Sequence, residues 1–265
     1  MGSSVIAALR WRGIRVVAHS SLESVALPKQ EDQWEVYYQS LKDYYFRRVL
    51  ADLIQGKRLH PGNLNAMAER WGQQASQKYL LRLQTLGLAS RVDEDVVFAR
   101  PELDNFGQTL QWFLAMVLQR EFQAEAIWNV RLEGLTGGGD FDVLALMGGT
   151  LFYFETKASP PNNVTYAEIK QFLSRQEQLS TDCAMIVNDT TLLIERNILD
   201  NLLRAIRLRF HLGKEQALAL VQSLSSGVYW VAPKLFVLNV KRDMVTNLER
   251  ALRFYFAHRV PMFPS

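Results

Sequence analysis

Apolar residues recur at helical spacing through most of the first hundred residues. Steps of three and four residues between apolar positions predict one helix over 34–56, ended by a glycine, and a second over 61–72. A third helix is expected over 74–86, followed by two short β-prone runs within 88–99 that flank an acidic turn. This part of the chain is therefore predicted to form three helices and a hairpin, preceded by a polar linker.

Helices and strands alternate in the rest of the chain. Helical periodicity marks the segments 104–123, 164–179, 195–209 and 243–258. Strand-like runs cover 126–132, 140–147, 150–158, 183–187 and 228–240. This alternation predicts an α/β fold with a central mixed sheet flanked by helices.

Charged residues interrupt two neighbouring strands that are otherwise apolar on both faces. The Gly148-Gly149 pair between them predicts a two-residue hairpin loop, and this register sets Asp142 opposite Glu155. Two facing carboxylates repel each other, most strongly where water is scarce, and a divalent cation between them would relieve the repulsion. Mg²⁺ or Mn²⁺ would accept such oxygen ligands. A bulge would instead shift the pairing by one residue and separate the carboxylates.

The same register sets Asp140 opposite Lys157, so that all four charged residues share one face of the hairpin. Lys157 would then lie beside a metal-bound water, where it can lower the pKa of that water or hold a phosphate oxygen. The competing interpretation is a cluster of surface charges at a strand end. That interpretation does not explain why the charges interrupt strands that are apolar on both faces.

An aspartate, a strand turn and a Glu-x-Lys tripeptide at a strand end resemble the PD-(D/E)XK nuclease superfamily, whose fold is restriction-endonuclease-like. The resemblance covers about residues 104–190, where the order helix, three strands, helix, strand matches the core of that family. It implies that Asp142 and Glu155 bind the metal, with the backbone carbonyl of Thr156 as a further ligand. It also implies that Lys157 assists the attacking water. The family's usual proline before the aspartate is missing here.

Many members of that superfamily add a glutamate from the first helix of the core. Glu121 follows Val117 by four residues on the apolar stripe of its helix, so it is expected to face the sheet and to support the metal. The alternative is a half-exposed charge at the end of the helix.

Three helices followed by a hairpin resemble a winged helix-turn-helix domain over about residues 36–101. The resemblance implies that the third helix enters the major groove of DNA. Its outward residues carry amide and cationic groups suited to base edges and phosphates, namely Gln74, Gln77, Lys78 and Arg82. The acidic turn of the hairpin would repel phosphates, so a protein contact, including one within a homodimer, is the alternative.

The composition is that of a soluble, ordered protein. Of the 265 residues 48% are hydrophobic and 22% are charged, which excludes a disordered chain. The net charge of +3 permits an acidic partner such as nucleic acid without establishing one. The single cysteine, Cys183, suits a reducing cytosol, and no apolar stretch is long enough to cross a membrane. The histidines are scattered, which argues against a zinc site.

These patterns predict an extension and linker at 1–35, a winged-helix module at 36–101 and a nuclease module at 102–265. The predicted activity is metal-dependent hydrolysis of phosphodiester bonds in the cytoplasm, with Mg²⁺ or Mn²⁺ as cofactor and with DNA preferred to RNA. Two other functions stay open: a DNA-binding regulator whose nuclease fold is inactive, and an adaptor that binds protein through the winged helix. The intact set of two carboxylates and a lysine favours the enzyme.

Overall fold

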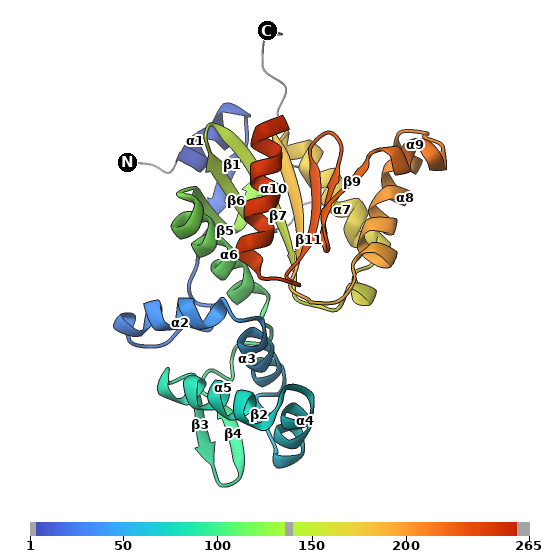
Figure 1. Cartoon of the computed structure of the whole chain (residues 1–265). Coiled ribbons are helices and arrows are strands. Elements are labelled where there is room, and N and C mark those ends of the chain that lie inside the picture. Colours follow the sequence, from blue (N-terminus) through green and yellow to red (C-terminus); the bar gives the residue numbers. More distant parts are fainter. Residues whose placement is uncertain (1–3, 136–139, 259–265) are drawn as a thin grey trace. The chain divides into compact units, whose positions relative to one another are not determined.

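The computed structural model describes residues 4–135 and 140–258, which fold into two compact units (Figure 1). The larger unit combines Met1–Ser20 with Leu114–Ser265, and the smaller unit covers Ser21–Phe113. The expected extension at 1–35 is therefore corrected. Its first residues form a helix and a strand that belong to the larger unit, because the strand pairs with that unit's sheet.

An eight-stranded mixed sheet forms the centre of the larger unit, in the order β1-β5-β6-β7-β8-β11-β10-β9. Its strands are β1 (Arg15–Ala18), β5 (Glu125–Glu133), β6 (Asp140–Met147), β7 (Thr150–Lys157), β8 (Cys183–Asn188), β9 (Val221–Ser225), β10 (Val228–Val231) and β11 (Leu235–Asn239). The β7, β8 and β11 strands are parallel, and the other neighbours are antiparallel. The predicted mixed sheet is confirmed.

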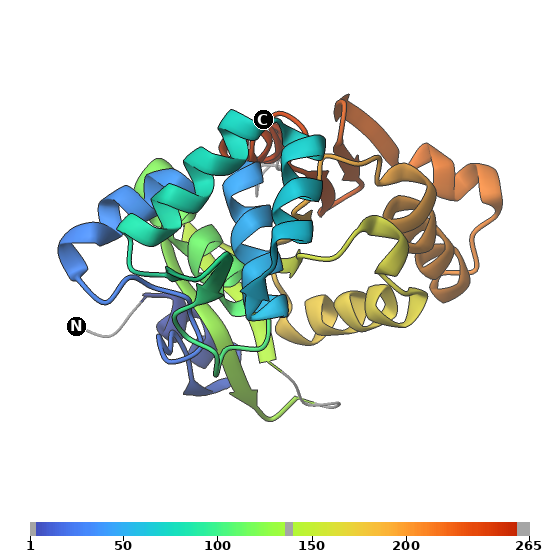
Figure 2. The ribbon, with the colours of Figure 1, turned by 90° about the horizontal axis from the view of Figure 1, so that it is seen from below.

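Helices cover both faces of this sheet. They are α1 (Ser4–Trp11), α7 (Tyr166–Leu179), α8 (Asp200–Arg209), α10 (Met244–His258) and the second half of α6 (Gly107–Phe122), which passes from the smaller unit into the larger one at Leu114. The short helix α9 (Lys214–Ala219) packs on α8 and on the edge strand β9. Tyr153 of β7 stacks on Phe172 of α7, while its neighbour Phe152 contacts Tyr255 of α10. Consecutive side chains of a strand point to opposite faces, so α7 and α10 lie on opposite sides of the sheet, as Figures 1 and 2 show.

The smaller unit contains four complete α-helices, a short 3₁₀ helix (Glu31–Gln33), the first half of α6 and a three-stranded sheet in the order β2-β4-β3. The four α-helices and the strands are α2 (Trp34–Leu41), α3 (Tyr44–Gly56), β2 (Arg58–Leu59), α4 (Pro61–Trp71), α5 (Gln73–Thr85), β3 (Ala89–Val92) and β4 (Asp95–Phe98). The helix expected over 34–56 is broken in two, because the Asp43 carboxylate accepts a hydrogen bond of 2.9 Å from the Tyr45 backbone N–H and so begins α3.

None of the helices in the described part of the chain is both long and apolar enough to span a membrane. The single cysteine, Cys183, is buried in β8. Burial raises the pKa of its thiol well above the usual value, so this cysteine packs as an apolar side chain.

Candidate active site

The β6–β7 hairpin has the predicted register up to the point where the charged residues begin. Pairing runs from Met147 and Thr150, beside the turn, to Val143 and Phe154. Both glycines of the turn have positive φ angles, 55° and 76°, which a two-residue hairpin loop of this kind requires. The turn therefore fixes which residues of the two strands face each other.

Asp142 does not continue the backbone pairing of β6 with β7. Its Oδ2 instead accepts hydrogen bonds from the Thr156 backbone N–H, at 2.6 Å, and from Thr156 Oγ1, at 2.9 Å. On the other side of β6, Asn129 of β5 stands opposite Asp142 and has a positive φ of 48°. The ladder is thus irregular at Asp142, and a side chain replaces the next backbone pairing.

This irregularity changes which side chains share a face. Phe141 packs edge-on against Tyr153 with 5.5 Å between ring centroids, although regular alternation puts it on the other face. Asp140 is exposed and forms an ion pair of 3.2 Å with Arg131 of β5. The expectation that Asp140 joins the other charged residues is therefore wrong, because alternation does not hold across the irregularity.

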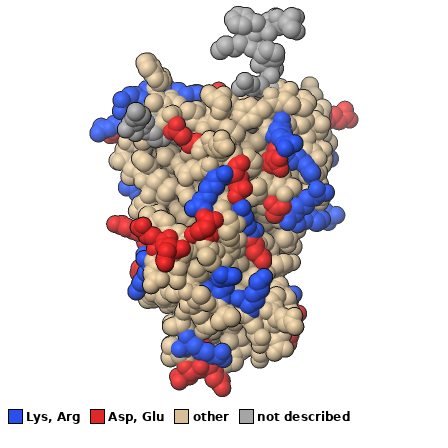
Figure 3. All heavy atoms as spheres, turned by 60° about the vertical axis from the view of Figure 1, so that its left-hand side comes forward, with Lys and Arg blue, Asp and Glu red and all other residues tan. Residues whose placement is uncertain are grey.

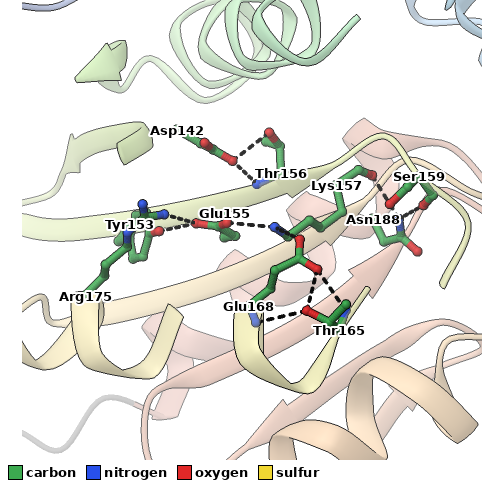
Figure 4. Close-up of polar contacts among 10 residues, drawn as sticks. All are labelled: Asp142, Tyr153, Glu155, Thr156, Lys157, Ser159, Thr165, Glu168, Arg175 and Asn188. Atoms are coloured by element: carbon green, nitrogen blue, oxygen red, sulfur yellow. Dashed lines mark hydrogen bonds and ion pairs between the residues drawn. The ribbon is translucent and has the colours of Figure 1, made fainter. Parts of the chain in front are cut away.

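Glu155 is buried, with only 5% of its surface exposed. Its Oε1 lies 3.0 Å from Lys157 Nζ. Its Oε2 accepts a hydrogen bond from the Tyr153 hydroxyl and lies 3.4 Å from the Arg175 guanidinium (Figure 4). A buried carboxylate without partners would be strongly unfavourable. Here two cations balance its charge and the hydroxyl supplies a hydrogen bond.

Lys157 lies between two carboxylates. Besides Glu155, it contacts Glu168 Oε1 at 2.7 Å, and Glu168 in turn begins α7 together with Thr165. Burial lowers the pKa of Lys157, but the two carboxylates more than offset this effect, so that its pKa is raised. Lys157 is therefore protonated near neutral pH.

Asp142 and Glu155 influence each other through their charges. None of the contacts drawn in Figure 4 joins the two carboxylates. Burial, followed by the charge of Glu155, raises the pKa of Asp142 to about 7, although the hydrogen bonds from Thr156 act in the opposite direction. Near neutral pH, Asp142 is thus only partly ionised, because its surroundings disfavour the charge.

This raised pKa predicts a loss of stability as pH rises. Folded Asp142 keeps its proton up to about pH 7, whereas the unfolded side chain releases it near pH ~4. Unfolding therefore releases a proton in this window, and stability falls with rising pH and then levels off above pH ~7. In urea unfolding with chelator, the Asp142→Asn variant should lack this decline, a difference on the order of a few kcal/mol between pH ~4.5 and ~8. Parallel profiles for the two proteins would contradict the assignment.

The oxygen atoms around Asp142 suit a hard divalent cation. Within residues 4–135 and 140–258, no group of three or more His, Cys, Asp or Glu side chains is arranged to hold a metal. Mg²⁺, however, commonly takes only one or two carboxylates and keeps several waters. In a β-strand the N–H and C=O of one residue point to the same neighbouring strand. Because the Thr156 N–H donates to Asp142 of β6, the Thr156 carbonyl is also directed toward β6. Asp142, Glu155 and this carbonyl are therefore chemically suitable donors.

Glu121 lies away from these residues. It is exposed and lines a surface hollow with Met147, Val245 and Arg253. Antiparallel pairing sets the start of β5 beside the end of β6 at the hairpin turn, and α6 ends just before β5. The end of α6 is therefore at the turn, whereas the carboxylates lie at the other end of the hairpin. The structure therefore does not bring Glu121 to the two carboxylates, contrary to the expectation from its spacing.

The four polar residues predicted to contact DNA are exposed on one side of α5. Gln74, Gln77, Lys78 and Arg82 line a shallow hollow there. Leu81, which is 64% exposed, lies among them, so this face also has an apolar component. On the face of the molecule drawn in Figure 3, Lys and Arg side chains are interspersed with Asp and Glu and do not form one broad basic field.

Three residues of the site were not found from the sequence. Glu168 had a recognisable signal, because Thr165-x-x-Glu168 is a capping box at the start of a helix that follows the lysine. Tyr153 lies two positions before Glu155 and so shares its face, which simple alternation indicates. Arg175 is twenty residues from Glu155 in sequence, and no local pattern marked its contact.

Comparison with known proteins gives few matches. No protein-family model matches the chain, and no curated protein does so. Two similar solved structures are protein VC1899 from Vibrio cholerae, 17% identical with a TM-score of 0.45, and Can2 from Sulfobacillus thermosulfidooxidans in complex with cyclic tetra-adenylate, 12% identical with a TM-score of 0.47. The matches cover 77% and 74% of this chain and 56% and 55% of those proteins. The chain thus spans about half of their length, and such TM-scores support no conclusion about its function.

Proposed function

We propose that the larger unit is a metal-dependent nuclease of the PD-(D/E)XK class, which hydrolyses phosphodiester bonds. One observation carries this proposal: half-buried Asp142 and buried Glu155 lie within each other's electrostatic influence, and Lys157 is 3.0 Å from Glu155. A carboxylate such as Asp142, whose charge is disfavoured by burial and by a neighbouring carboxylate, is typical of sites adapted for chemistry. The order of elements from α6 to β8 supports the same class.

Asp142, Glu155 and the Thr156 carbonyl would hold Mg²⁺ or Mn²⁺ in this proposal. The ion, when bound, supplies an activated water and positive charge near the phosphorus atom. Lys157 keeps its proton because its pKa is raised, so we assign it to donating hydrogen bonds to a phosphate oxygen. Arg175 restrains Glu155 from the opposite side.

The proposal is tested by a cleavage assay over single- and double-stranded DNA and RNA, with Mg²⁺, with Mn²⁺ and with chelator. Cleavage that requires the metal and stops with chelator is the expected result. A DNA-binding protein with an inactive nuclease fold is the second candidate. It is favoured by the closed network in which both oxygens of Glu155 already have partners. No cleavage and no thermal stabilisation by Mn²⁺ would favour this candidate.

We further propose that the smaller unit is a winged helix that binds DNA through α5. Lys78 and Arg82 are exposed on this helix, so each is expected to contact a phosphate. Lys78→Ala and Arg82→Ala should each weaken binding and reduce the salt slope by ~1. The control is Lys29→Ala, an exposed lysine of the same unit that lies outside the helix. If fluorescence anisotropy gives the same affinity and salt dependence for all four proteins, the α5 face serves a protein contact instead.

A further inference from the structure

Glu168 divides its two carboxylate oxygens between two tasks. Its Oε2 accepts hydrogen bonds from the Thr165 backbone N–H and from Thr165 Oγ1, both at 2.8 Å. Its Oε1 lies 2.7 Å from Lys157 Nζ. The start of α7 therefore fixes the position of Glu168, and Glu168 then offers Lys157 a carboxylate whose place does not depend on Glu155.

This second carboxylate matters as soon as Glu155 binds a cation. Lys157 Nζ is 3.0 Å from Glu155 Oε1, and a positive ammonium group and a divalent ion repel each other at the same oxygen. A cation at this oxygen would therefore weaken the contact between Glu155 and Lys157. A lysine side chain is a flexible chain of four carbons, so without another partner the Lys157 ammonium group would lose its defined position. Glu168 supplies that partner, and Lys157, which has three N–H donors, can remain bonded to it while also donating to a substrate.

We infer that Glu168 is a positioning residue, which keeps Lys157 at the site when Glu155 holds the metal. The inference rests on the proposed nuclease function and adds a residue to it. The alternative role for Glu168 is only that of a helix cap. The two roles require different chemical groups at position 168. A helix cap needs only a hydrogen-bond acceptor, whereas an ionic partner for Lys157 needs a negative charge.

Two variants separate these roles. Glu168→Gln keeps the acceptor that a capping box requires but places a neutral amide beside Lys157. Thr165→Ala removes the cap hydroxyl and leaves the carboxylate in place. We expect Glu168→Gln to reduce kcat ~10–100-fold with little change in KM or melting temperature. Thr165→Ala should instead lower the melting temperature by ~2–4 °C and keep most of the turnover.

A metal titration gives a readout that needs no cleavage. In Glu168→Gln, Lys157 has only Glu155 as a partner and competes harder with the ion, so half-maximal thermal stabilisation should require ~10-fold more Mn²⁺ than in the wild type. In a Lys157→Met background, the Glu168→Gln change should have no effect on this titration. A double-mutant comparison of this kind isolates the contribution that passes through Lys157.

The outcomes distinguish this inference from the proposed function. Wild-type cleavage or Mn²⁺ stabilisation combined with unaltered values in Glu168→Gln overturns the positioning role alone. An effect of Glu168→Gln that persists in the Lys157→Met background also overturns it, because Lys157 would then not transmit the effect. A wild type that shows neither Mn²⁺ stabilisation nor cleavage contradicts the nuclease proposal, and the positioning role falls with it.

Discussion

Replacing Glu155 with alanine should destabilise the larger unit by about 3–5 kcal/mol in metal-free buffer. The variant leaves the largely buried Arg175 without this carboxylate and leaves Lys157 with Glu168 alone. It also removes the acceptor of the Tyr153 hydroxyl. An uncompensated buried charge is among the most unfavourable changes that a single substitution can make. Urea unfolding followed by circular dichroism measures this loss.

Glu133→Ala is the matched control. Glu133 also pairs with an arginine, Arg15, at 3.2 Å, but its side chain is 60% exposed and that of Arg15 is 80% exposed. A solvated ion pair of this kind contributes less than about 1 kcal/mol. Equal losses in the Glu133 and Glu155 variants would show that burial does not set the strength of the network and would remove the physical basis for treating Glu155 as part of a site.

This expectation has the opposite sign to the one that the sequence alone suggests. Two facing carboxylates without cations repel, so removing Glu155 would relieve strain and leave the metal-free fold intact. Arg175 reverses that sign, because it would be left largely buried without the Glu155 carboxylate. This partner comes from α7, and a contact between residues twenty positions apart produces no periodic pattern in the sequence. The electrostatics of the site could therefore not be predicted from the hairpin alone.

Other parts of the site followed from local rules. The two glycines of the hairpin loop fix the register from Met147 and Thr150 to Val143 and Phe154, because only one pairing suits a loop of that length. The order of helices and strands from α6 to β8 likewise followed from apolar periodicity, which depends on burial of one face or of both. Such features are encoded within a few residues, so the sequence was sufficient for them.

The sequence did not predict two kinds of feature: places where the backbone departs from regular strand geometry, and the end of the sheet that a helix residue reaches. The positive φ of Asn129 interrupts β5 opposite Asp142. The amino-acid sequence alone does not distinguish an asparagine in that conformation from one in a regular strand. Glu121 has the spacing of the apolar stripe of its helix, but its side chain is exposed at the helix end. Spacing also does not show which end of the sheet a residue reaches. The antiparallel pairing of Glu125 with Leu146 places the end of α6 at the hairpin turn. An antiparallel β5–β6 pair, once assumed from the order of the strands, would have given the same placement.

Replacing Asp142 with asparagine should abolish cleavage and leave the protein folded. Asparagine keeps an oxygen that can accept the hydrogen bonds from the Thr156 N–H and hydroxyl, so the hairpin should retain its shape. It also removes a charge that burial and Glu155 disfavour, so metal-free stability at pH ~8 should equal or exceed that of the wild type. The loss of a charged metal donor should nevertheless lower the single-turnover rate by about 1,000-fold or more, which corresponds to several kcal/mol of charge stabilisation.

Asp140→Asn is the control for this change, because Asp140 lies two residues away, is exposed and pairs with Arg131. It should cleave like the wild type and keep the rise in melting temperature with Mn²⁺, which Asp142→Asn should lose. If both variants cleave at the wild-type rate with Mn²⁺, the carboxylate of Asp142 is not a metal donor. The buried hairpin end would then be a structural charge network, and the hydrolysis of phosphodiesters would have to be sought elsewhere in the chain.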